Sequence, residues 1–221
     1  SVKGRSQDEA EANYRRLVNE RGLVPVVPFD DPAIIAGQGT IALEILRALP
    51  DTDTLIIQLS GGGLLAGIAM VAKSINPRIE VVGVSLERSP AMLNSLEAGA
   101  PVQIEERDSV ADSLLGGIGM ENRYTLPLVK RYVDRHVVIA EAPVKEAMVF
   151  LFDRHRLVVE GAAAVGVGAL LHRLLDVDGR RVVTVLSGST VDSAAYIRIL
   201  QDSDIAPGAS PPPGRERGET S

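Results

Sequence analysis

The sequence contains no cysteine and no tryptophan, and aromatic residues make up only 3% of its 221 positions. Without cysteine the chain has no disulfide, no thiolate metal site and no cysteine nucleophile, and this composition fits a reducing compartment. The net charge is −6, and no basic run is visible. Because proteins that bind nucleic acid need a basic patch, usually with stacking aromatic residues, we expect no nucleic-acid partner.

Long hydrophobic runs are missing too. No apolar stretch is long enough to cross a bilayer. The N-terminal segment 1–6 has basic residues but no apolar core behind them, unlike a signal peptide. Hydrophobic residues make up 45% of the chain and charged residues 24%, which is typical of a globular protein with a sizeable core. We therefore predict a cytoplasmic protein with no membrane partner.

Short apolar runs alternate with segments of helical period. Strands are predicted at residues 54–59, 79–84, 136–140 and 181–186. Helices are predicted at residues 7–20, 37–49, 64–75, 89–98, 125–133, 143–155 and 162–175, with a last helix that ends at residue 200. Because most of these strands show little polar alternation and are followed by a helix, we predict an α/β fold in three layers, a parallel sheet flanked by helices.

A glycine-rich loop follows the first predicted strand. It runs through Ser60, Gly61, Gly62 and Gly63 and leads into a helix at Leu64. Glycines allow successive backbone N–H groups to turn toward one point, and the N-terminus of the helix adds the positive end of its dipole. The loop therefore suits a phosphate group, although an ordinary tight turn is the alternative. It matches neither a Walker loop nor the dinucleotide fingerprint.

Three further segments carry polar residues at the ends of predicted elements. Ser187 and Gly188 follow the last strand, where ligands of open α/β sheets bind, and a serine hydroxyl there can meet a ring nitrogen. A helix N-cap is the other interpretation of that serine. The loop 29–32 precedes a helix, and Glu160 stands at the entrance of a buried helix, where a carboxylate is favourable in any case. His136, His155 and His172 show no metal-ligand spacing, and we predict that all three lie at the surface.

Taken in order, these motifs resemble one family, the fold-type II pyridoxal-phosphate (PLP) enzymes, which include threonine dehydratase, serine dehydratase and serine racemase. The resemblance covers about residues 1–200. The segments that carry it are 29–44, 61–64, 158–163 and 186–188. Within the family, segments 84–88, 111–124 and 159–166 look closest to the hydroxyectoine-utilisation dehydratases.

The resemblance implies a set of site residues. The expected cofactor-binding residues are Ser60, Gly61, Gly62, Gly63 and Leu64 at the phosphate, Ser187 and Gly188 at the pyridine nitrogen, and Phe29 beside the cofactor. The expected substrate-pocket residues are Asp30, Asp112 and Ser113. The implied domains are the end of a small domain and crossover at 1–35, the C-terminal part of a large PLP-binding domain at 36–204, and a disordered tail at 205–221. For the full-length protein, the resemblance implies a homodimer.

The clearest departure from the family is an absent lysine. The four lysines are Lys3, Lys73, Lys130 and Lys145, and none lies in the family's Schiff-base context of Ser-x-Lys-x-Arg-Gly. We therefore expect no catalytic residue within this chain and no activity from the chain alone, because its chemistry needs that amine. Where several members carry a metal-binding carboxylate, this chain has the segment 84–86, Val-Ser-Leu, so we expect no metal.

The predicted function of the full-length protein is that of a PLP-dependent ammonia-lyase. It would convert serine, threonine or a hydroxyectoine-derived substrate to a 2-oxo acid and ammonia. One alternative is a non-catalytic, truncated or degenerate PLP-fold protein. A nucleotide-binding Rossmann-like module is a further alternative, in which Glu87 would meet a ribose, but the glycine spacing does not fit that fingerprint.

Overall fold

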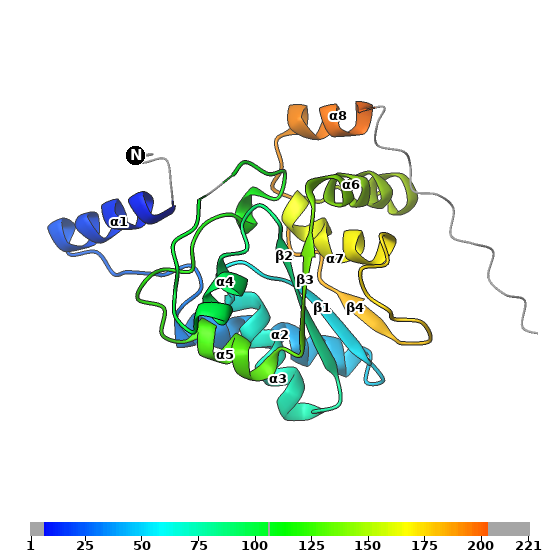
Figure 1. Ribbon diagram of the computed structural model, residues 1–221, viewed down its shortest axis with the longest axis horizontal. Coiled ribbons are helices and arrows are strands. Elements are labelled where there is room, and N and C mark those ends of the chain that lie inside the picture. Colours follow the sequence, from blue (N-terminus) through cyan, green and yellow to red (C-terminus); the bar gives the residue numbers. More distant parts are fainter. Residues whose placement is uncertain (1–6, 106, 203–221) are drawn as a thin grey trace, which may run out of the picture.

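The computed structural model describes residues 7–105 and 107–202 and is built around a four-stranded parallel sheet (Figure 1). The sheet has the order β3-β2-β1-β4. The strands are β1 (Thr54–Gln58), β2 (Glu80–Leu86), β3 (Arg135–Ile139) and β4 (Val182–Thr184). All pairings are parallel, so the carboxyl ends of β1 and its neighbour β4 lie next to each other. The predicted tail at 205–221 lies outside the described residues.

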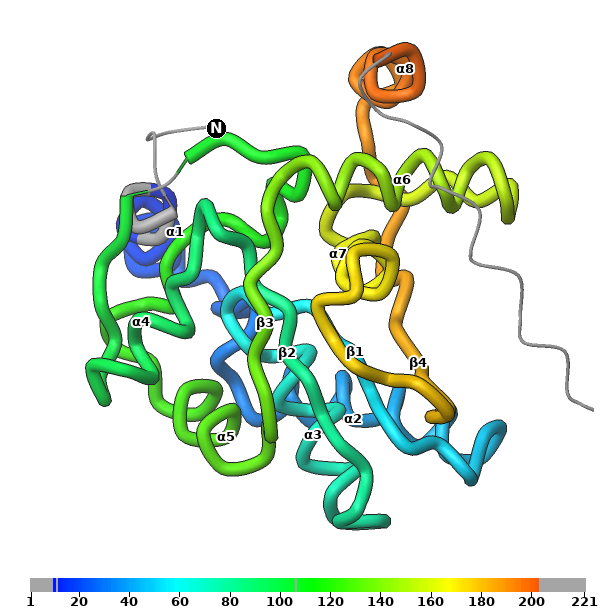
Figure 2. Tube along the Cα trace, turned by 45° about the vertical axis from the view of Figure 1, so that its right-hand side comes forward, coloured from blue at the N-terminus to red at the C-terminus, as the bar shows by residue number. Residues whose placement is uncertain are grey.

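Helices cover both faces of the sheet. They are α1 (Gln7–Arg21), α2 (Pro32–Ala48), α3 (Gly63–Ile75), α4 (Ala91–Ala98), α5 (Thr125–Tyr132), α6 (Glu141–His155), α7 (Gly161–Leu171) and α8 (Ser193–Gln201), with a 3₁₀ helix η1 (Asp112–Leu114). Figure 2 shows α2, α3 and α5 on one face and α6 and α7 on the other, with α8 beyond α6. The α/β prediction of a parallel sheet flanked by helices is confirmed.

Alternation along the buried strands creates two cores. Leu55 and Ile57 of β1 point into the core beneath α2 and α3, whereas Ile56 between them points into the core beneath α6 and α7. Each of these three side chains is fully buried. Because successive side chains of a strand point to opposite faces, an unbroken apolar strand is what a sheet covered on both faces requires.

Helix α2 begins earlier than the sequence pattern indicated. Its predicted start was residue 37, but the helix starts at Pro32. Asp31 is the N-cap, and its carboxylate accepts hydrogen bonds from the N–H groups of Ala33 (2.7 Å) and Ile34 (3.3 Å). Proline at the first helical position and aspartate before it form a favourable start, because proline lacks the N–H that would be unpaired there.

Gly39 of α2 and Gly67 of α3 allow these two helices to pack closely. A Cβ at Gly67 would lie 2.3 Å from the carbonyl oxygen of Ile35 and 2.8 Å from the backbone nitrogen of Gly39. A Cβ at Gly39 would lie 3.2 Å from the carbonyl oxygen of Gly67. The two helices therefore approach with backbone close to backbone. This crossing holds α3, and with it the loop that enters α3, against the segment before α2.

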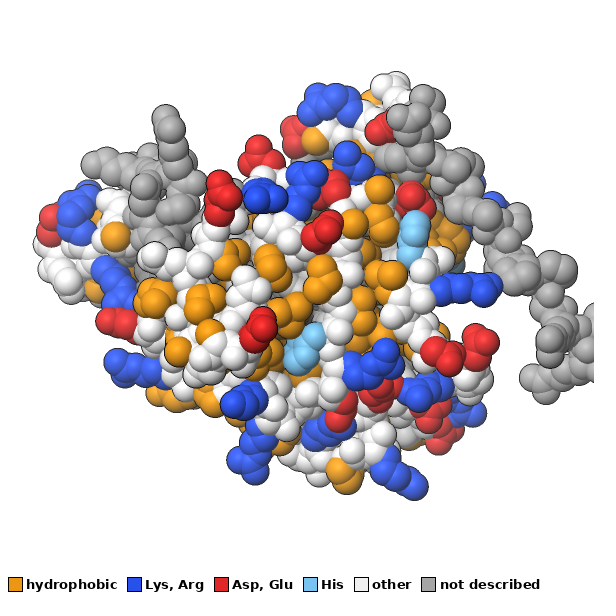
Figure 3. Space-filling view, viewed as in Figure 1, with side chains coloured by type: hydrophobic (Ala, Val, Ile, Leu, Met, Phe, Trp, Pro, Cys, Tyr) orange, Lys and Arg blue, Asp and Glu red, His pale blue; other side chains and the backbone are white. Residues whose placement is uncertain are grey.

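The N-terminal ends of the strands carry ion pairs. Charged side chains of both signs gather over this end of the molecule (Figure 3). Glu80 pairs with Arg135 at 3.3 Å and with Arg180, and Arg181 pairs with Asp51. No described helix is long and apolar enough to traverse a lipid bilayer.

Candidate functional site

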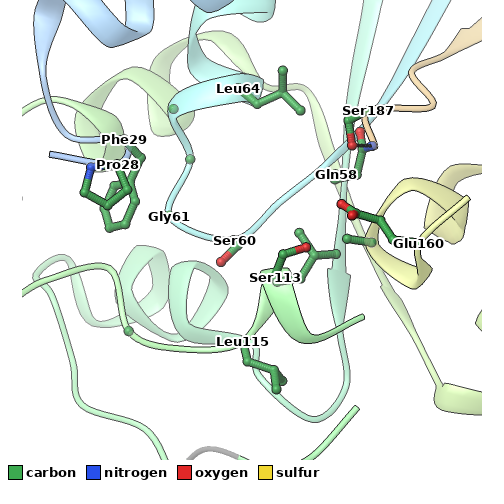
Figure 4. Close-up of a pocket in the computed structure, with 15 residues that line it drawn as sticks. Pro28, Phe29, Gln58, Ser60, Gly61, Leu64, Ser113, Leu115, Glu160 and Ser187 are labelled. Atoms are coloured by element: carbon green, nitrogen blue, oxygen red, sulfur yellow. Dashed lines mark hydrogen bonds between the residues drawn. The ribbon is translucent and has the colours of Figure 1, made fainter. Parts of the chain in front are cut away.

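A pocket of about 390 Å³ opens at the carboxyl ends of β1 and β4 (Figure 4). The residues that line it are Pro28, Phe29, Gln58, Ser60, Gly61, Gly62, Gly63, Leu64, Ser113, Leu114, Leu115, Gly117, Glu160, Ala162 and Ser187. In Figure 4, Phe29 lies on one side of the glycine loop, and Ser187, Gln58 and Glu160 lie together on the other. Segments far apart in the sequence thus meet where parallel sheets place their ligands.

The glycine loop is shaped so that side chains cannot replace its glycines. Gly62 has a φ of 92°, in the left-handed region, and is the N-cap of α3 without any side-chain cap. A Cβ at Gly61 would lie 2.4 Å from the Phe29 ring, and one at Gly63 would lie 3.0 Å from the Phe29 Cα and carbonyl oxygen. The first turn of α3 therefore faces the pocket with backbone N–H groups that no side chain caps, which fits an anionic group.

Ser187 is held on the opposite side of the pocket by Gln58. The Gln58 amide nitrogen donates to the Ser187 hydroxyl at 2.8 Å and to the Val185 carbonyl oxygen at 2.8 Å. Gln58 is only 4% exposed, whereas Ser187 is exposed. The two residues are 129 positions apart and meet because β1 and β4 are neighbours in the sheet.

Glu160 supports the same loop from another direction. Its backbone N–H donates to the Gly188 carbonyl oxygen at 3.2 Å, and its carboxylate accepts from the Thr190 N–H at 3.1 Å. A Cβ at Gly188 would lie 2.7 Å from that carboxylate. The loop after β4 therefore passes close over Glu160, which stands directly before α7. Gly188 contacts Glu160 and does not line the pocket.

The three expected substrate residues lie in different places. Ser113 lines the pocket. Asp112, its neighbour in η1, points toward a separate hollow and accepts a hydrogen bond from the Ser113 N–H at 2.8 Å. Asp30 does not line the pocket either. Its carboxylate accepts from the N–H groups of Arg123, Tyr124 and Thr125 at 2.7, 2.9 and 2.8 Å, so it caps the start of α5.

Sequence reasoning did not select Gln58 or Glu160 as site residues. Gln58 is the one polar residue after Thr54 in an otherwise apolar strand, and that was the available signal. Its partner Ser187 is distant in the sequence, so no local pattern links the two. Glu160 was interpreted as a favourable charge at a helix N-terminus, which describes its position but not its contact with the loop after β4.

No described lysine lines the pocket. Lys73, on α3, pairs with Asp134 at 2.6 Å. The three histidines lie at the surface, as predicted. His172 contacts Glu146 at 2.7 Å, and His136 lies on β3, where partial burial of its ring against the sheet lowers its pKa. Within the described residues, no cluster of His, Asp or Glu side chains could hold a metal ion.

Known proteins resemble the chain in both sequence and structure. It is 39% identical over 207 residues to an L-threonine ammonia-lyase of Thermotoga maritima, and the match covers 94% of this chain and 51% of that protein. It is 36% identical over 190 residues to a catabolic L-threonine dehydratase of Escherichia coli, with coverage of 85% and 57%. The threonine deaminase isoform 2 of Solanum lycopersicum superposes with a TM-score of 0.83 at 29% identity, with coverage of 93% and 57%.

The chain spans between about half and three fifths of the length of these relatives. Residues 1–188 match the family described as pyridoxal-phosphate dependent enzyme. This match covers most of the 221 residues, including the glycine loop and Ser187. The chain therefore belongs to the family of pyridoxal-phosphate dependent enzymes.

Proposed function

We propose that this chain holds PLP in the pocket between the glycine loop and Ser187. The observation that carries the proposal is that these two features, predicted separately, line one pocket. The uncapped N-terminus of α3 supplies backbone N–H groups for the phosphate. Ser187 lines the pocket across from that loop and would meet the ring nitrogen, and Phe29 lines it beside the loop.

The proposed activity of the whole protein is that of an ammonia-lyase acting on serine or threonine. Relatives of this chain carry the names of threonine ammonia-lyase and threonine dehydratase, which supports this reaction type. When bound, PLP supplies an electron sink for charge that develops on the substrate carbon. A neutral serine at the ring nitrogen suits an elimination that needs only moderate stabilisation of that charge.

The residues of this chain would bind and orient the cofactor and the substrate. The proton transfers would need a group that these residues do not supply. Lys73, Lys130 and Lys145 do not line the pocket, so none of them is placed to act as the amine. We propose that Ser113 contacts the substrate and that Asp30 serves the pocket indirectly, by fixing the segment that carries Phe29. Three expectations stay predictions: a hydroxyectoine-derived substrate, a homodimer, and the division of the chain into domains at residues 35 and 204.

A titration tests the cofactor assignment. The protein is titrated with PLP and followed by absorbance, with inorganic phosphate as competitor and Ser187→Ala as the variant. We expect saturable binding that phosphate weakens, and a weaker complex for the variant. If PLP does not bind, or if phosphate does not compete, the assignment of the pocket is wrong.

An assay of the complete gene product tests the reaction. L-threonine and L-serine are supplied with PLP, and 2-oxo acid and ammonia are measured together. Equal amounts of the two products are expected from at least one substrate. PLP binding without any oxo acid from either substrate would favour the non-catalytic alternative.

A further inference from the structure

Gln58 is a buried polar residue at the wall of the pocket, and only part of its amide is hydrogen-bonded. It lies at the carboxyl end of β1, is 4% exposed and lines the pocket. Its amide nitrogen makes two bonds, but its amide oxygen is buried without a partner among the described residues. An unpaired buried acceptor destabilises the fold, because it loses its hydrogen bonds to water without gaining others. A leucine would fill the same space without that cost, so the amide is best explained by what its nitrogen does.

The orientation of the amide follows from its partners. The Val185 carbonyl oxygen can only accept a hydrogen bond, so the Gln58 atom that faces it at 2.8 Å must be the nitrogen. That nitrogen has two hydrogens. One goes to Val185, and the other goes to the Ser187 hydroxyl oxygen at 2.8 Å. Ser187 therefore accepts a hydrogen bond from Gln58 and cannot direct its own hydrogen back along the same line.

The hydrogen of the Ser187 hydroxyl is therefore available to donate to a molecule bound in the pocket. Within the described part of the chain, no atom accepts a hydrogen bond from it, and the residue is exposed at the pocket wall. We propose that Gln58 is a positioning residue that fixes Ser187 as a hydrogen-bond donor to an unprotonated ring nitrogen. This inference rests on the proposed function, since it takes the ring nitrogen of PLP as the acceptor.

The experiment uses the complete protein loaded with PLP that is labelled with ¹⁵N at the ring nitrogen. The ¹⁵N resonance reports protonation and hydrogen bonding at that atom. Gln58→Met removes the amide at similar size, and Ser187→Ala removes the hydroxyl. Gln103→Met is the matched control, because Gln103 is exposed and remote from the pocket lining. PLP affinity is measured for each variant and for the double variant of Gln58 and Ser187.

We expect Gln58→Met to move the ¹⁵N resonance toward the position seen with Ser187→Ala and to weaken PLP binding about three- to tenfold, the range of one lost hydrogen bond. The double variant should show little further change, because both substitutions remove the same directed bond. Gln103→Met should leave the resonance and the affinity unchanged. Should Gln58→Met fail to fold, Gln58→Asn, which keeps an amide but is one methylene shorter, should show the same shift.

The outcomes separate this inference from the proposed function. No PLP binding by the unaltered protein, or an unmoved resonance in Ser187→Ala, would overturn the proposed site itself. A resonance that moves in Ser187→Ala but stays in place in both Gln58 variants would overturn the role of Gln58 alone. A wild-type resonance typical of a protonated pyridine would do the same, because Ser187 would then have to accept.

Discussion

The two loops that face each other across the pocket are built on different principles. The loop from Ser60 to Gly63 has backbone groups aimed at the pocket, and close contact with Phe29 leaves no room for a side chain at Gly61 or Gly63. The loop after β4 is held largely by side chains, since the Gln58 amide donates to the Val185 carbonyl oxygen and the Ser187 hydroxyl, and the Glu160 carboxylate accepts from the Thr190 N–H. The difference teaches that one half of the site depends on the absence of atoms and the other on particular polar partners.

Adding one methyl group to the glycine loop should have the largest effect. In Gly63→Ala the Cβ would meet backbone atoms of Phe29 at 3.0 Å, so the pocket wall has to move. We expect up to about 3 kcal/mol of destabilisation and PLP affinity lower by at least about tenfold. Denaturant unfolding and PLP titration measure the two effects. Gly37→Ala is the control: it lies in α2 with open space around it and should be stabilising by about 0.5–1 kcal/mol.

Asp30→Ala should disturb the glycine-loop half of the site, although Asp30 itself does not line the pocket. The substitution removes an acceptor from three N–H groups at the start of α5 and releases the segment that carries Phe29. A loss of about 2 kcal/mol in the free energy of unfolding is expected, as for a strong N-cap. Asp30→Asn keeps one oxygen for Tyr124 and Thr125 and should lose less. Equal losses for the two variants in thermal melts would contradict this account.

Glu160→Leu should weaken the loop after β4 with a smaller cost. It leaves the Thr190 N–H without its acceptor, so about 1 kcal/mol of stability should be lost. PLP binding should weaken through a less ordered Ser187, whereas Glu160→Gln, which can still accept, should stay close to the wild type. A full loss of PLP binding in Glu160→Gln would instead assign the charge a direct role.

His136 should give the smallest effect and lies outside both loops. Burial lowers the pKa of this histidine below its ordinary value of 6.5, so the unfolded chain binds the proton more readily than the folded chain. Stability should therefore be fully present above about pH 6.5 and decline slightly as the pH falls below it. Urea unfolding at several pH values measures the slope, which His136→Gln should flatten. PLP affinity should change little in that variant, because His136 does not line the pocket.

Local sequence signals predicted most of the fold and the glycine half of the site. The apolar run of β1, the glycines and the following helix lie within about twenty neighbouring residues, so their pattern can be recognised in the sequence alone. The start of α2 was predicted too late, because Gly39 and Thr40 resemble a helix cap in sequence. Gly39 is a glycine for its contact with α3, a reason that only the packed helices reveal.

By itself, the sequence determined the α/β class, the glycine loop that leads into α3 and the resemblance to the PLP-dependent family. Only the tertiary structure decided that Gln58 holds Ser187, that Glu160 holds the loop around Gly188, and that Asp30 caps α5 and does not line the pocket. The physical reason is the range of each interaction. Backbone conformation is set by neighbouring residues, whereas these side chains find their partners through strand order and helix packing, which join positions about thirty to 129 residues apart.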